Sequence, residues 1–316
     1  MNRHTLGRLE KWRSSLDVCI RCGYCYAHCP IYKSTRWETD SPRAKLALIY
    51  GMLNGEVEPS DYIAEKMLEC FYCKSCQTNC SSSIPITEIL TDAQADLREA
   101  GFLAKGTTSE TSRAKCALCL ACVRMCKHEA RSYDGSIVVD RVKCQSCGAC
   151  LEVCPGRGIS MNRGFGTEEE VLQKEVARFL KPDGSRGAKV IVFGCDWTSY
   201  PGFQVSEMCG PGREPEYTII VAMCAGRLQS RLIMDALMQG AWGVLVTMCP
   251  EGKCEHDGNV RATAMLASFQ KALETLDVAP QRVRRETVEK GNTKQMEDAI
   301  KGFMKQIREL GPVLTR

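Results

Sequence analysis

The sequence predicts a multidomain protein with a small α-helical module, a small α+β module and an α/β domain that contains a parallel sheet. Three observations predict this order. Cysteines are concentrated in the first half of the chain, in four runs of the same spacing, and helical periodicity fills the gap between the first two runs. The last third instead alternates short apolar runs with helical patterns, which is typical of α/β folds. A chain of 316 residues is long enough for two or three domains.

Sixteen of the 21 cysteines form one motif, C-x2-C-x2-C-x3-C, which occurs four times. The copies are Cys19-Cys22-Cys25-Cys29, Cys70-Cys73-Cys76-Cys80, Cys116-Cys119-Cys122-Cys126 and Cys144-Cys147-Cys150-Cys154. This run is typical of bacterial ferredoxins: three thiolates reach three irons of one [4Fe–4S] cube, and the fourth ligates the other cube of a pair. Two pairs of motifs therefore predict four [4Fe–4S] clusters.

The exchange of fourth cysteines predicts a ligand set for each cube. The sets are Cys19, Cys22, Cys25 and Cys80; Cys70, Cys73, Cys76 and Cys29; Cys116, Cys119, Cys122 and Cys154; and Cys144, Cys147, Cys150 and Cys126. A zinc site built from two C-x2-C pairs has no use for a third cysteine at the same step. A disulfide framework belongs to short secreted chains and does not fit this length.

The first predicted domain, residues 1–103, is an α-helical ferredoxin module. The pair Ser41-Pro42 is typical of a helix start, and Gly55 of a helix end. A second helical pattern opens at Pro59-Ser60 and leads into the second motif, and a third opens at Thr87.

The second predicted domain, residues 114–160, is an α+β two-cluster ferredoxin module. Its two motifs are close, with 18 positions from Cys126 to Cys144, and a turn signal precedes the short apolar stretch Ile137–Val139. The stretch before it, Ala104–Arg113, is polar and non-periodic, and we expect it to be a linker.

The third predicted domain, residues 187–316, has a parallel sheet. Val190–Gly194, Thr218–Met223 and Gly243–Met248 are near-continuous apolar runs of strand length, which is typical of strands buried on both faces. We expect a fourth strand near Val283–Val288 and a final helix that carries Met296, Ile300, Phe303, Ile307 and Leu310.

A cysteine follows each of the three apolar strands: Cys195, Cys224 and Cys249. Parallel strands end at one edge of the sheet, so we expect these thiols to converge, with Cys254 joining them after a short loop. A [2Fe–2S] cluster and a tetrahedral zinc ion are both geometrically possible, and the four cubes upstream favour the cluster. Cysteines can also be buried as small apolar residues, but this alternative does not readily explain why a cysteine follows each of three strands. Cys209 has no partner in this scheme.

Composition restricts the partners. The formal net charge is +4, but four oxidised cubes, each with four thiolates, add about −8, so the loaded protein is acidic. The sequence has no pattern of basic residues interleaved with aromatic residues, so it does not predict nucleic-acid binding. No apolar run reaches the roughly 18 residues of a membrane span, and Met1–Leu16 lacks the apolar core of a signal peptide. We therefore expect a cytoplasmic protein, because free thiols survive in that compartment.

The first module resembles the C-type iron–sulfur subunit of heterodisulfide reductases and related two-cluster oxidoreductase subunits. The resemblance lies in CIRCGYCYAHCP, SPRAKLAL and CFYCKSCQTNC. Those subunits normally have proline after the last cysteine of the second motif, where this chain has Ser81; the departure removes no ligand. The second module resembles a two-cluster ferredoxin, with Lys127 where proline is usual after the third motif.

The last domain resembles the delta subunit of methyl-viologen-reducing hydrogenase, through FGCDWTSYPG, VAMCAGR and VTMCPEGKCEHDG. The resemblance implies a [2Fe–2S] cluster and electron transfer from a hydrogenase or formate dehydrogenase to the flavin-containing A-type subunit of a heterodisulfide reductase. That family often has a second cysteine where this chain has Thr198. This favours Cys195, Cys224, Cys249 and Cys254 as the ligands, with a rearranged set that includes Cys209 as the alternative.

These features predict an iron–sulfur electron-transfer subunit with no substrate-converting site of its own. It would relay electrons from a dehydrogenase, a hydrogenase or a flavin protein to a heterodisulfide reductase-like catalytic subunit, or in reverse, within an electron-bifurcating complex. The chain has no adjacent Cys-Cys pair, so the resemblance assigns substrate chemistry to a separate protein like the B-type subunit of those reductases. The alternatives are a stand-alone reductase of thiol or disulfide substrates, and an iron–sulfur arm of a membrane-attached respiratory complex.

Overall fold

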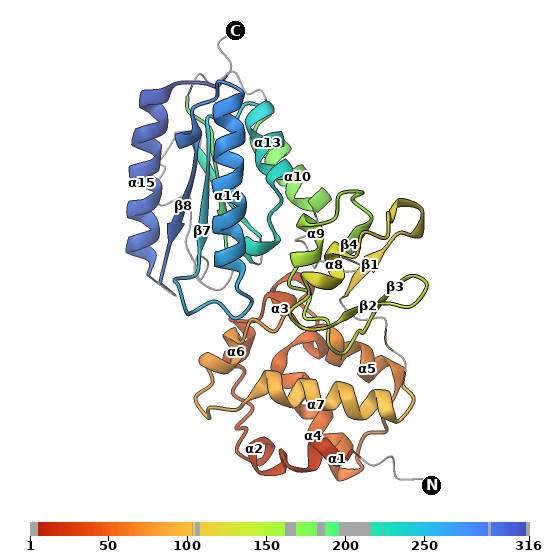
Figure 1. The fold of residues 1–316 in the computed structure, drawn as a ribbon. Coiled ribbons are helices and arrows are strands. Elements are labelled where there is room, and N and C mark those ends of the chain that lie inside the picture. The colour runs from red at the N-terminus through yellow and green to blue at the C-terminus, as the bar shows by residue number, and fades with distance from the viewer. Residues whose placement is uncertain are drawn as a thin grey trace. The chain divides into compact units, whose positions relative to one another are not determined.

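The computed structural model describes residues 6–102, 104, 108–161, 169–181, 187–195, 216–222, 224–289 and 292–313. Figure 1 shows their helices and strands. The chain forms two compact units: Met1–Ser146 with Val153–Phe165, and Cys147–Glu152 with Gly166–Arg316. The three-domain division predicted above stays a prediction.

The N-terminal part of the first unit is helical. Its helices are α1 (Gly7–Glu10), α2 (Arg13–Asp17), α3 (Pro30–Thr35), α4 (Pro42–Asn54), α5 (Asp61–Leu68), α6 (Ser75–Thr78) and α7 (Ile86–Glu99). The side chains of Ser41 and Ser60 accept hydrogen bonds from the N–H groups of Ala44 and Ile63 and so cap α4 and α5. Both predicted helix starts are confirmed, whereas α7 begins one residue before Thr87.

The core of this helical part lies between α4, α5 and α7. Apolar side chains at helical spacing meet there, among them Ile49 of α4, Met67 of α5 and Leu97 of α7, which are all fully buried. Several motif cysteines pack against the same core. The core therefore fixes the helix ends from which the first two motif loops leave.

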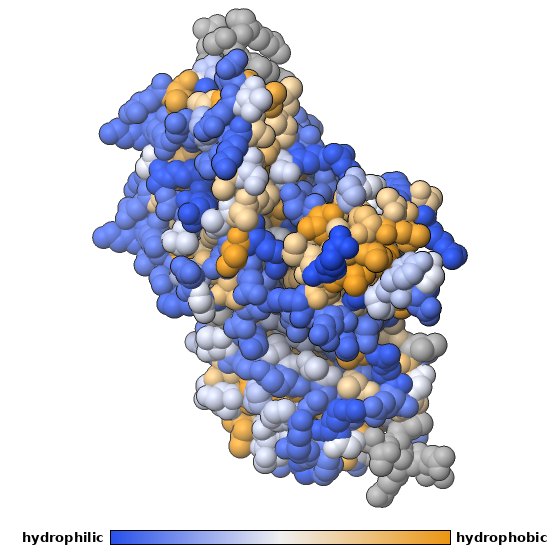
Figure 2. All heavy atoms as spheres, in the orientation of Figure 1, coloured by the Kyte–Doolittle hydropathy of each residue, from blue (hydrophilic) through white to orange (hydrophobic). Residues whose placement is uncertain are grey.

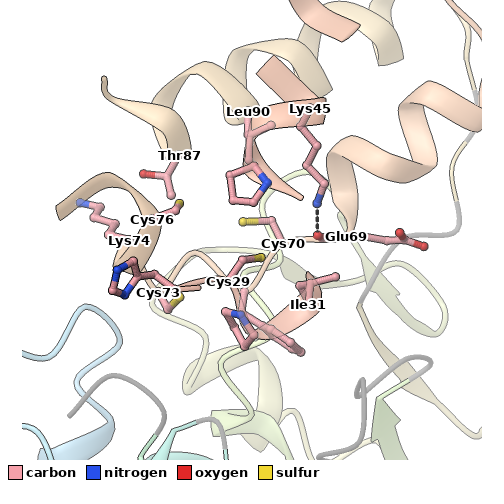
Figure 3. A pocket seen from close by; sticks show the side chains of 14 residues that line it. Cys29, Ile31, Lys45, Glu69, Cys70, Cys73, Lys74, Cys76, Thr87 and Leu90 are labelled. Atoms are coloured by element: carbon pink, nitrogen blue, oxygen red, sulfur yellow. Dashed lines mark hydrogen bonds between the residues drawn. The ribbon is translucent and has the colours of Figure 1, made fainter. Parts of the chain in front are cut away.

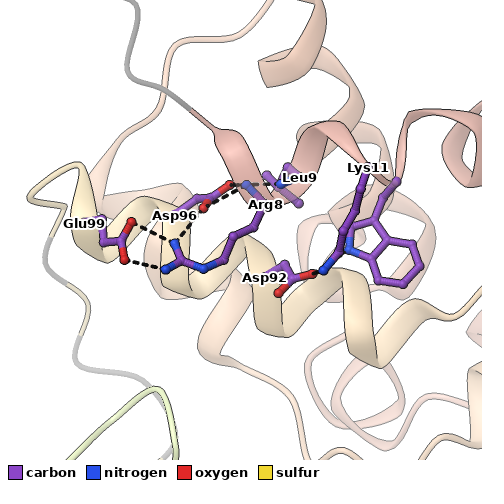
Figure 4. Close-up of polar contacts among 7 residues, drawn as sticks. Arg8, Leu9, Lys11, Asp92, Asp96 and Glu99 are labelled. Atoms are coloured by element: carbon purple, nitrogen blue, oxygen red, sulfur yellow. Dashed lines mark hydrogen bonds and ion pairs between the residues drawn. The ribbon is translucent and has the colours of Figure 1, made fainter.

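Three carboxylates of α7 bind the N-terminal segment: Asp92, Asp96 and, through the side chain of Arg8, Glu99 (Figure 4). The backbone N–H groups of Arg8 and Leu9 each donate to Asp96 Oδ2 over 3.0 Å, and Asp96 is buried. Asp92, one turn earlier, accepts from Trp12 Nε1 over 2.6 Å. Asp96 thus satisfies the free N–H groups at the start of α1, which has only four residues.

We expect Asp96→Ala to detach this segment, because it leaves two N–H groups without their acceptor at a cost of about 1–3 kcal/mol. Amide hydrogen exchange of residues 8–12, followed by mass spectrometry, should become about tenfold faster or more. Glu99→Ala is the matched control, since Glu99 is exposed and accepts from the side chain of Arg8 rather than from the backbone. Equal exchange in both variants would contradict the prediction.

The part with the third and fourth motifs is built on two short antiparallel ladders. Strand β1 (Ser109–Thr111) pairs with β4 (Ile159–Met161), and β2 (Arg131–Tyr133) pairs with β3 (Ile137–Val139). Two short helices, α8 (Ala121–Arg124) and α9 (Ala149–Glu152), carry cysteines of the motifs. The linker prediction is therefore wrong for Ser109–Thr111: these polar residues carry no strand signal, and their pairing with β4 is set by the tertiary structure.

Apolar side chains gather on the surface over β1 and β4 (Figure 2). The exposed large apolar residues of this part of the chain include Leu118, Met125, Tyr133 and Val138. Leu118 lies between two cysteines of the third motif, so an apolar surface residue stands directly beside this motif.

The second unit contains a four-stranded parallel sheet in the order β6-β5-β7-β8. The strands are β5 (Val190–Gly194), β6 (Tyr217–Val221), β7 (Gly243–Met248) and β8 (Val283–Thr287). The predicted parallel sheet is confirmed, and the bounds of β5 and β7 are those of the apolar runs.

Helices cover both faces of this sheet. Helices α10 (Glu169–Phe179), α13 (Ser230–Met238) and α14 (Gly258–Thr275) pack on one face, against alternate strand residues such as Phe193. Helix α15 (Thr293–Leu310) packs on the other face through Met296, Ile300, Phe303, Met304 and Ile307. No helix among the described residues combines the length and the apolar character that a membrane crossing needs.

Candidate metal centres

The four motif loops share one backbone conformation. The residue before the second cysteine is left-handed in every copy: Arg21, Tyr72, Leu118 and Ser146 have φ between 51° and 54°. The residue after the second cysteine is also left-handed: Gly23, Lys74, Leu120 and Gly148 have φ between 55° and 80°. The equal spacing of the cysteines is therefore matched by an equal path of the chain.

This conformation fits an anionic cluster. Left-handed residues within a turn point successive backbone N–H groups into one concavity, a geometry that holds phosphates and iron–sulfur clusters. Six of the eight positions carry a side chain, and each such residue costs about 1–3 kcal/mol of backbone strain. Strain of this kind repeated four times is typical of a binding site, and four thiols per motif supply the ligands that iron–sulfur clusters use.

The second ligand set lines one cavity (Figure 3). Cys70, Cys73 and Cys76 come from the second motif loop, and Cys29 comes from the N-terminal end of α3. Figure 3 shows their sulfur atoms around the same space. The structure thus brings together three cysteines of one motif with the fourth cysteine of the other, which is the exchange that a two-cluster arrangement requires.

The surroundings of Cys29, Cys70 and Cys76 in this cavity raise the pKa values of their thiols and so disfavour the thiolates. Burial raises the pKa of Cys29 to about 11, and it raises the pKa of Cys76 well above the ordinary range. The buried Lys45 opposes this effect, because its charge lowers the pKa of Cys29 and of Cys70. Its Nζ donates to the carbonyl oxygen of Glu69, next to Cys70. Iron ions would supply the further positive charge that four thiolates need here.

The first ligand set is placed in part. Cys19, Cys25 and Cys80 pack against the helical core, whereas Cys22 is exposed. Burial, with smaller contributions from the charges of Cys29 and Cys19, raises the pKa of Cys25 to about 11. Cys25 therefore lies near a cysteine of its own predicted set and near one of the other set.

The third and fourth motifs are divided between the two units. Cys116, Cys119, Cys122, Cys126, Cys144 and Cys154 belong to the first unit, and Cys147 and Cys150 to the second. Backbone N–H groups donate to two of the sulfurs: Ala130 to Cys126 over 3.4 Å and Gly158 to Cys154 over 3.3 Å. The ligand sets of the third and fourth cubes stay predictions.

Four thiols meet at the edge of the parallel sheet. Cys195 and Cys249 follow the neighbouring strands β5 and β7, and their Sγ atoms are 3.5 Å apart. Cys254 makes side-chain hydrogen bonds with both Cys224 and Cys249. The predicted convergence of Cys195, Cys224, Cys249 and Cys254 thus has a direct geometric counterpart. Cys209 and Thr198 lie outside the described residues.

One of these thiols is favoured as a thiolate. Hydrogen bonds from Cys224 and Cys249 lower the pKa of Cys254. The contact with Cys254 raises the pKa of Cys224, and the contacts with Cys195 and then Cys254 raise the pKa of Cys249. The N–H of Gly258 also donates to Cys254 Sγ over 3.1 Å.

Among the described residues, no group of three or more His, Cys, Asp or Glu side chains is arranged to hold a single metal ion.

Two glycines allow this close approach. A Cβ atom on Gly258 would lie 2.2 Å from Cys224 Sγ, and one on Gly226 would lie 2.5 Å from the Cα of Gly258. Real Cβ contacts are not this short, so neither position accepts a side chain without moving its neighbour. Cys224 therefore reaches the start of α14 because both backbones lack side chains there.

Two arginines link the fourth motif to the part of the second unit that carries this thiol group. Arg261 donates from Nη2 to the carbonyl oxygen of Cys147 over 3.2 Å and from Nη1 to that of His256 over 2.6 Å. Gly148 packs on Arg227, since a Cβ atom there would lie 2.7 Å from Arg227 Cγ. The loop of the fourth motif is thus joined to the loop that carries Cys254.

Comparison with known proteins identifies this last domain. Residues 190–311 match the family model described as methyl-viologen-reducing hydrogenase, delta subunit. The D-type iron-sulfur subunit of the F420-non-reducing hydrogenase of Archaeoglobus profundus is 31% identical over 127 residues, which are 39% of this chain and 90% of that protein. The chain belongs to the family of the methyl-viologen-reducing hydrogenase delta subunit.

The delta-family domain, residues 190–311, is joined here to [4Fe–4S] domains. Residues 15–84 match the 4Fe-4S dicluster domain model and residues 137–160 the 4Fe-4S binding domain model. The C-type subunit of the ferredoxin:CoB-CoM heterodisulfide reductase of Methanosarcina acetivorans is 35% identical over 78 residues, 24% of this chain and 28% of that protein. The predicted fusion of a domain like this C-type subunit, a ferredoxin domain and a delta-family domain is confirmed.

A longer relative is similar over more of the chain. The A-type subunit of the ferredoxin:CoB-CoM heterodisulfide reductase of Methanosarcina mazei is 32% identical over 201 residues, 63% of this chain. The delta-family chain described here spans about a quarter of the length of that relative, 25%.

Sequence reasoning missed several residues around these centres. The left-handed positions are not signalled, because Arg21, Tyr72 and Leu118 stand where glycine would be expected. Lys45 and Gly258 also act through contacts with distant segments. In the delta-family domain, Gly226 and Gly258, which follow Cys224 and Cys254 in the sequence, were the available signal of close packing.

Proposed function

We propose that this chain is an iron–sulfur electron-transfer subunit with four [4Fe–4S] clusters and one [2Fe–2S] cluster. It relays electrons from a dehydrogenase, a hydrogenase or a flavin protein to a heterodisulfide reductase-like catalytic subunit, or in reverse. The observation that carries this proposal is that Arg261 donates hydrogen bonds both to the backbone of Cys147 in the fourth motif and to the loop that carries Cys254, because it links two kinds of cysteine site within the second unit. We also propose a cytoplasmic location, where free thiols persist.

Contacts within each unit support an order of cofactors. In the second unit, Arg261 connects the backbone of Cys147 to the loop of Cys254. In the first unit, burial and the charges of Cys70 and Cys144 raise the pKa of Tyr72, so Cys144 of the fourth motif lies near the second motif loop. The proposed route therefore runs from the binuclear cluster to the fourth cube, and from there to the second and first cubes, in either direction.

The proposed partners follow from the family resemblance, and the relatives support them as a class. They are a flavin-containing protein like the A-type subunit of heterodisulfide reductase, a catalytic protein like its B-type subunit, and a hydrogenase or formate dehydrogenase, in an electron-bifurcating complex. Relatives of the delta-family domain are iron–sulfur subunits of hydrogenases, and other relatives are subunits of heterodisulfide reductases. The residues of this chain would bind and tune the clusters, which supply the one-electron chemistry when bound.

Iron analysis tests the proposal. The full chain purified without oxygen should hold about 18 iron atoms, four for each cube and two for the binuclear cluster, with an equal amount of acid-labile sulfide. Dithionite should bleach the brown absorbance and produce paramagnetic signals of both cluster types. Co-purifying proteins and flavin would identify the complex. Zinc in place of iron, without sulfide, would refute the proposal.

A second candidate function rests on the thiols of the delta-family domain. The lowered pKa of Cys254 and the 3.5 Å separation of Cys195 and Cys249 are features of reactive thiol pairs. Thiol–disulfide exchange would then reduce a disulfide substrate as Cys195 and Cys249 are oxidised to a disulfide, and an added dithiol reductant would restore the two thiols for the next turnover. Turnover that survives removal of iron by a chelator would favour this function over electron transfer between partners.

A further inference from the structure

Arg131 is a buried cation beside the third motif. It is the first residue of β2, and only 4% of its surface is exposed. Its Nη1 donates to Cys122 Sγ over 3.5 Å and to Thr111 Oγ1 over 2.9 Å, and its Nη2 donates to Ser109 Oγ over 3.0 Å. The guanidinium thus lies between a cysteine of the third motif and strand β1.

The acceptors around Arg131 do not balance its charge. The three that it contacts are two hydroxyl groups and one thiol sulfur. Among the described residues, no carboxylate forms an ion pair with Arg131, and no acceptor lies within hydrogen-bond distance of its buried Nε. Burying an arginine without a counter-charge is costly, so the surroundings of Arg131 are incomplete without an anion.

Ser109 extends this contact toward the fourth motif. Its Oγ accepts a hydrogen bond from Arg131 and lies 3.9 Å from Cys144 Sγ. Because the hydroxyl accepts from Arg131, its own proton is available to the sulfur. Arg131 therefore reaches Cys122 directly and Cys144 through Ser109, and these cysteines belong to the predicted sets of the third and fourth cubes.

We propose that Arg131 is a positioning residue that supplies the counter-charge of these two clusters and raises their reduction potentials. This inference rests on the proposed function. One-electron reduction takes a cube with four thiolates from about −2 to about −3. A fixed cation and N–H donors stabilise the more negative state, so reduction becomes easier. The third cube receives the direct hydrogen bond, and its potential is raised more than that of the fourth.

Redox titration of the full chain, monitored by electron paramagnetic resonance, tests this role. In Arg131→Gln the equilibrium constant for reduction of one cube should fall at least tenfold, which is about 59 mV for a one-electron couple. Arg124→Gln is the matched control: it removes the same charge near the same motif, but Arg124 donates from the surface to the carbonyl oxygen of Cys119. Its potentials should stay those of the parent protein.

Iron content separates the two proposals. A parent protein without cubes refutes the proposed function, whereas an Arg131→Gln protein with full iron and unchanged potentials overturns the role of Arg131 alone. If Arg131→Gln loses iron, Ser109→Ala decides, because it keeps the arginine and removes the hydroxyl that lies between it and Cys144. A lowered potential of one cube in Ser109→Ala supports the proposal, and an unchanged titration overturns it.

Discussion

Replacing Cys249 by serine is expected to remove the binuclear cluster and to stop electron exchange through the delta-family domain. Cys249 is buried, follows β7, one of the two central strands, and contacts Cys195 and Cys254. Serine is a poor ligand for iron at neutral pH, since its hydroxyl does not ionise as a thiol does. Iron should fall by two of about 18 atoms per chain, and reduction of the four cubes by dithionite should persist.

Cys209→Ser is the control for this substitution. If Cys195, Cys224, Cys249 and Cys254 are the ligands, Cys209→Ser should keep the signal of the reduced binuclear cluster. Loss of that signal in Cys209→Ser, with its retention in Cys249→Ser, would replace the proposed ligand set by one that includes Cys209. Loss of all clusters in Cys249→Ser would instead show that the chain needs this thiol in order to fold.

Gly258→Ala should disrupt the same centre without touching a ligand. The new methyl group would lie 2.2 Å from Cys224 Sγ, and the backbone N of Gly226 stands 3.1 Å away on the same side. Cys224 or the start of α14 must therefore shift, which alters the position of Cys224 relative to Cys254. We expect the binuclear cluster to be lost about 10- to 100-fold more readily, measured as iron that a chelator removes at a fixed time.

Gly302→Ala is the matched control for the added methyl group. Gly302 lies within α15, and a Cβ atom there would meet nothing within 4 Å. This substitution should leave iron release unchanged and stabilise the helix by about 0.5–1 kcal/mol. Equal iron release from both alanine variants would mean that the contact between Gly258 and Cys224 does not govern the centre.

The sequence predicted those features that depend on local patterns: the buried strands, the edge at which they end and the starts of two helices. Val190–Gly194 and Gly243–Met248 are near-continuous apolar runs, as expected for strands covered by helices on both faces of the sheet, so their bounds could be predicted. Parallel strands end at the same edge of the sheet, and this rule predicts that Cys195 and Cys249 converge there; that their strands are neighbours comes from the structure. The helix starts at Ser41 and Ser60 were predictable because capping is local.

Features set by distant contacts were not predictable. Ser109–Thr111 is polar, and its strand exists through pairing with β4, about fifty positions later. Arg131 is one of 42 basic residues, and nothing in its neighbours marks it as buried. Cys147–Glu152 belongs to the second unit although the residues on both sides belong to the first, which no local pattern reveals.

The left-handed residues of the motif loops have a consequence for biogenesis. In a newly made chain, Arg21, Tyr72, Leu118 and Ser146 must adopt a backbone conformation that residues with side chains disfavour. No bound cluster offsets this strain at that stage. We expect the empty loops to relax and to be the first parts of the nascent protein open to oxidation and proteolysis. Cells starved of iron should therefore lose this polypeptide by degradation rather than accumulate an empty form.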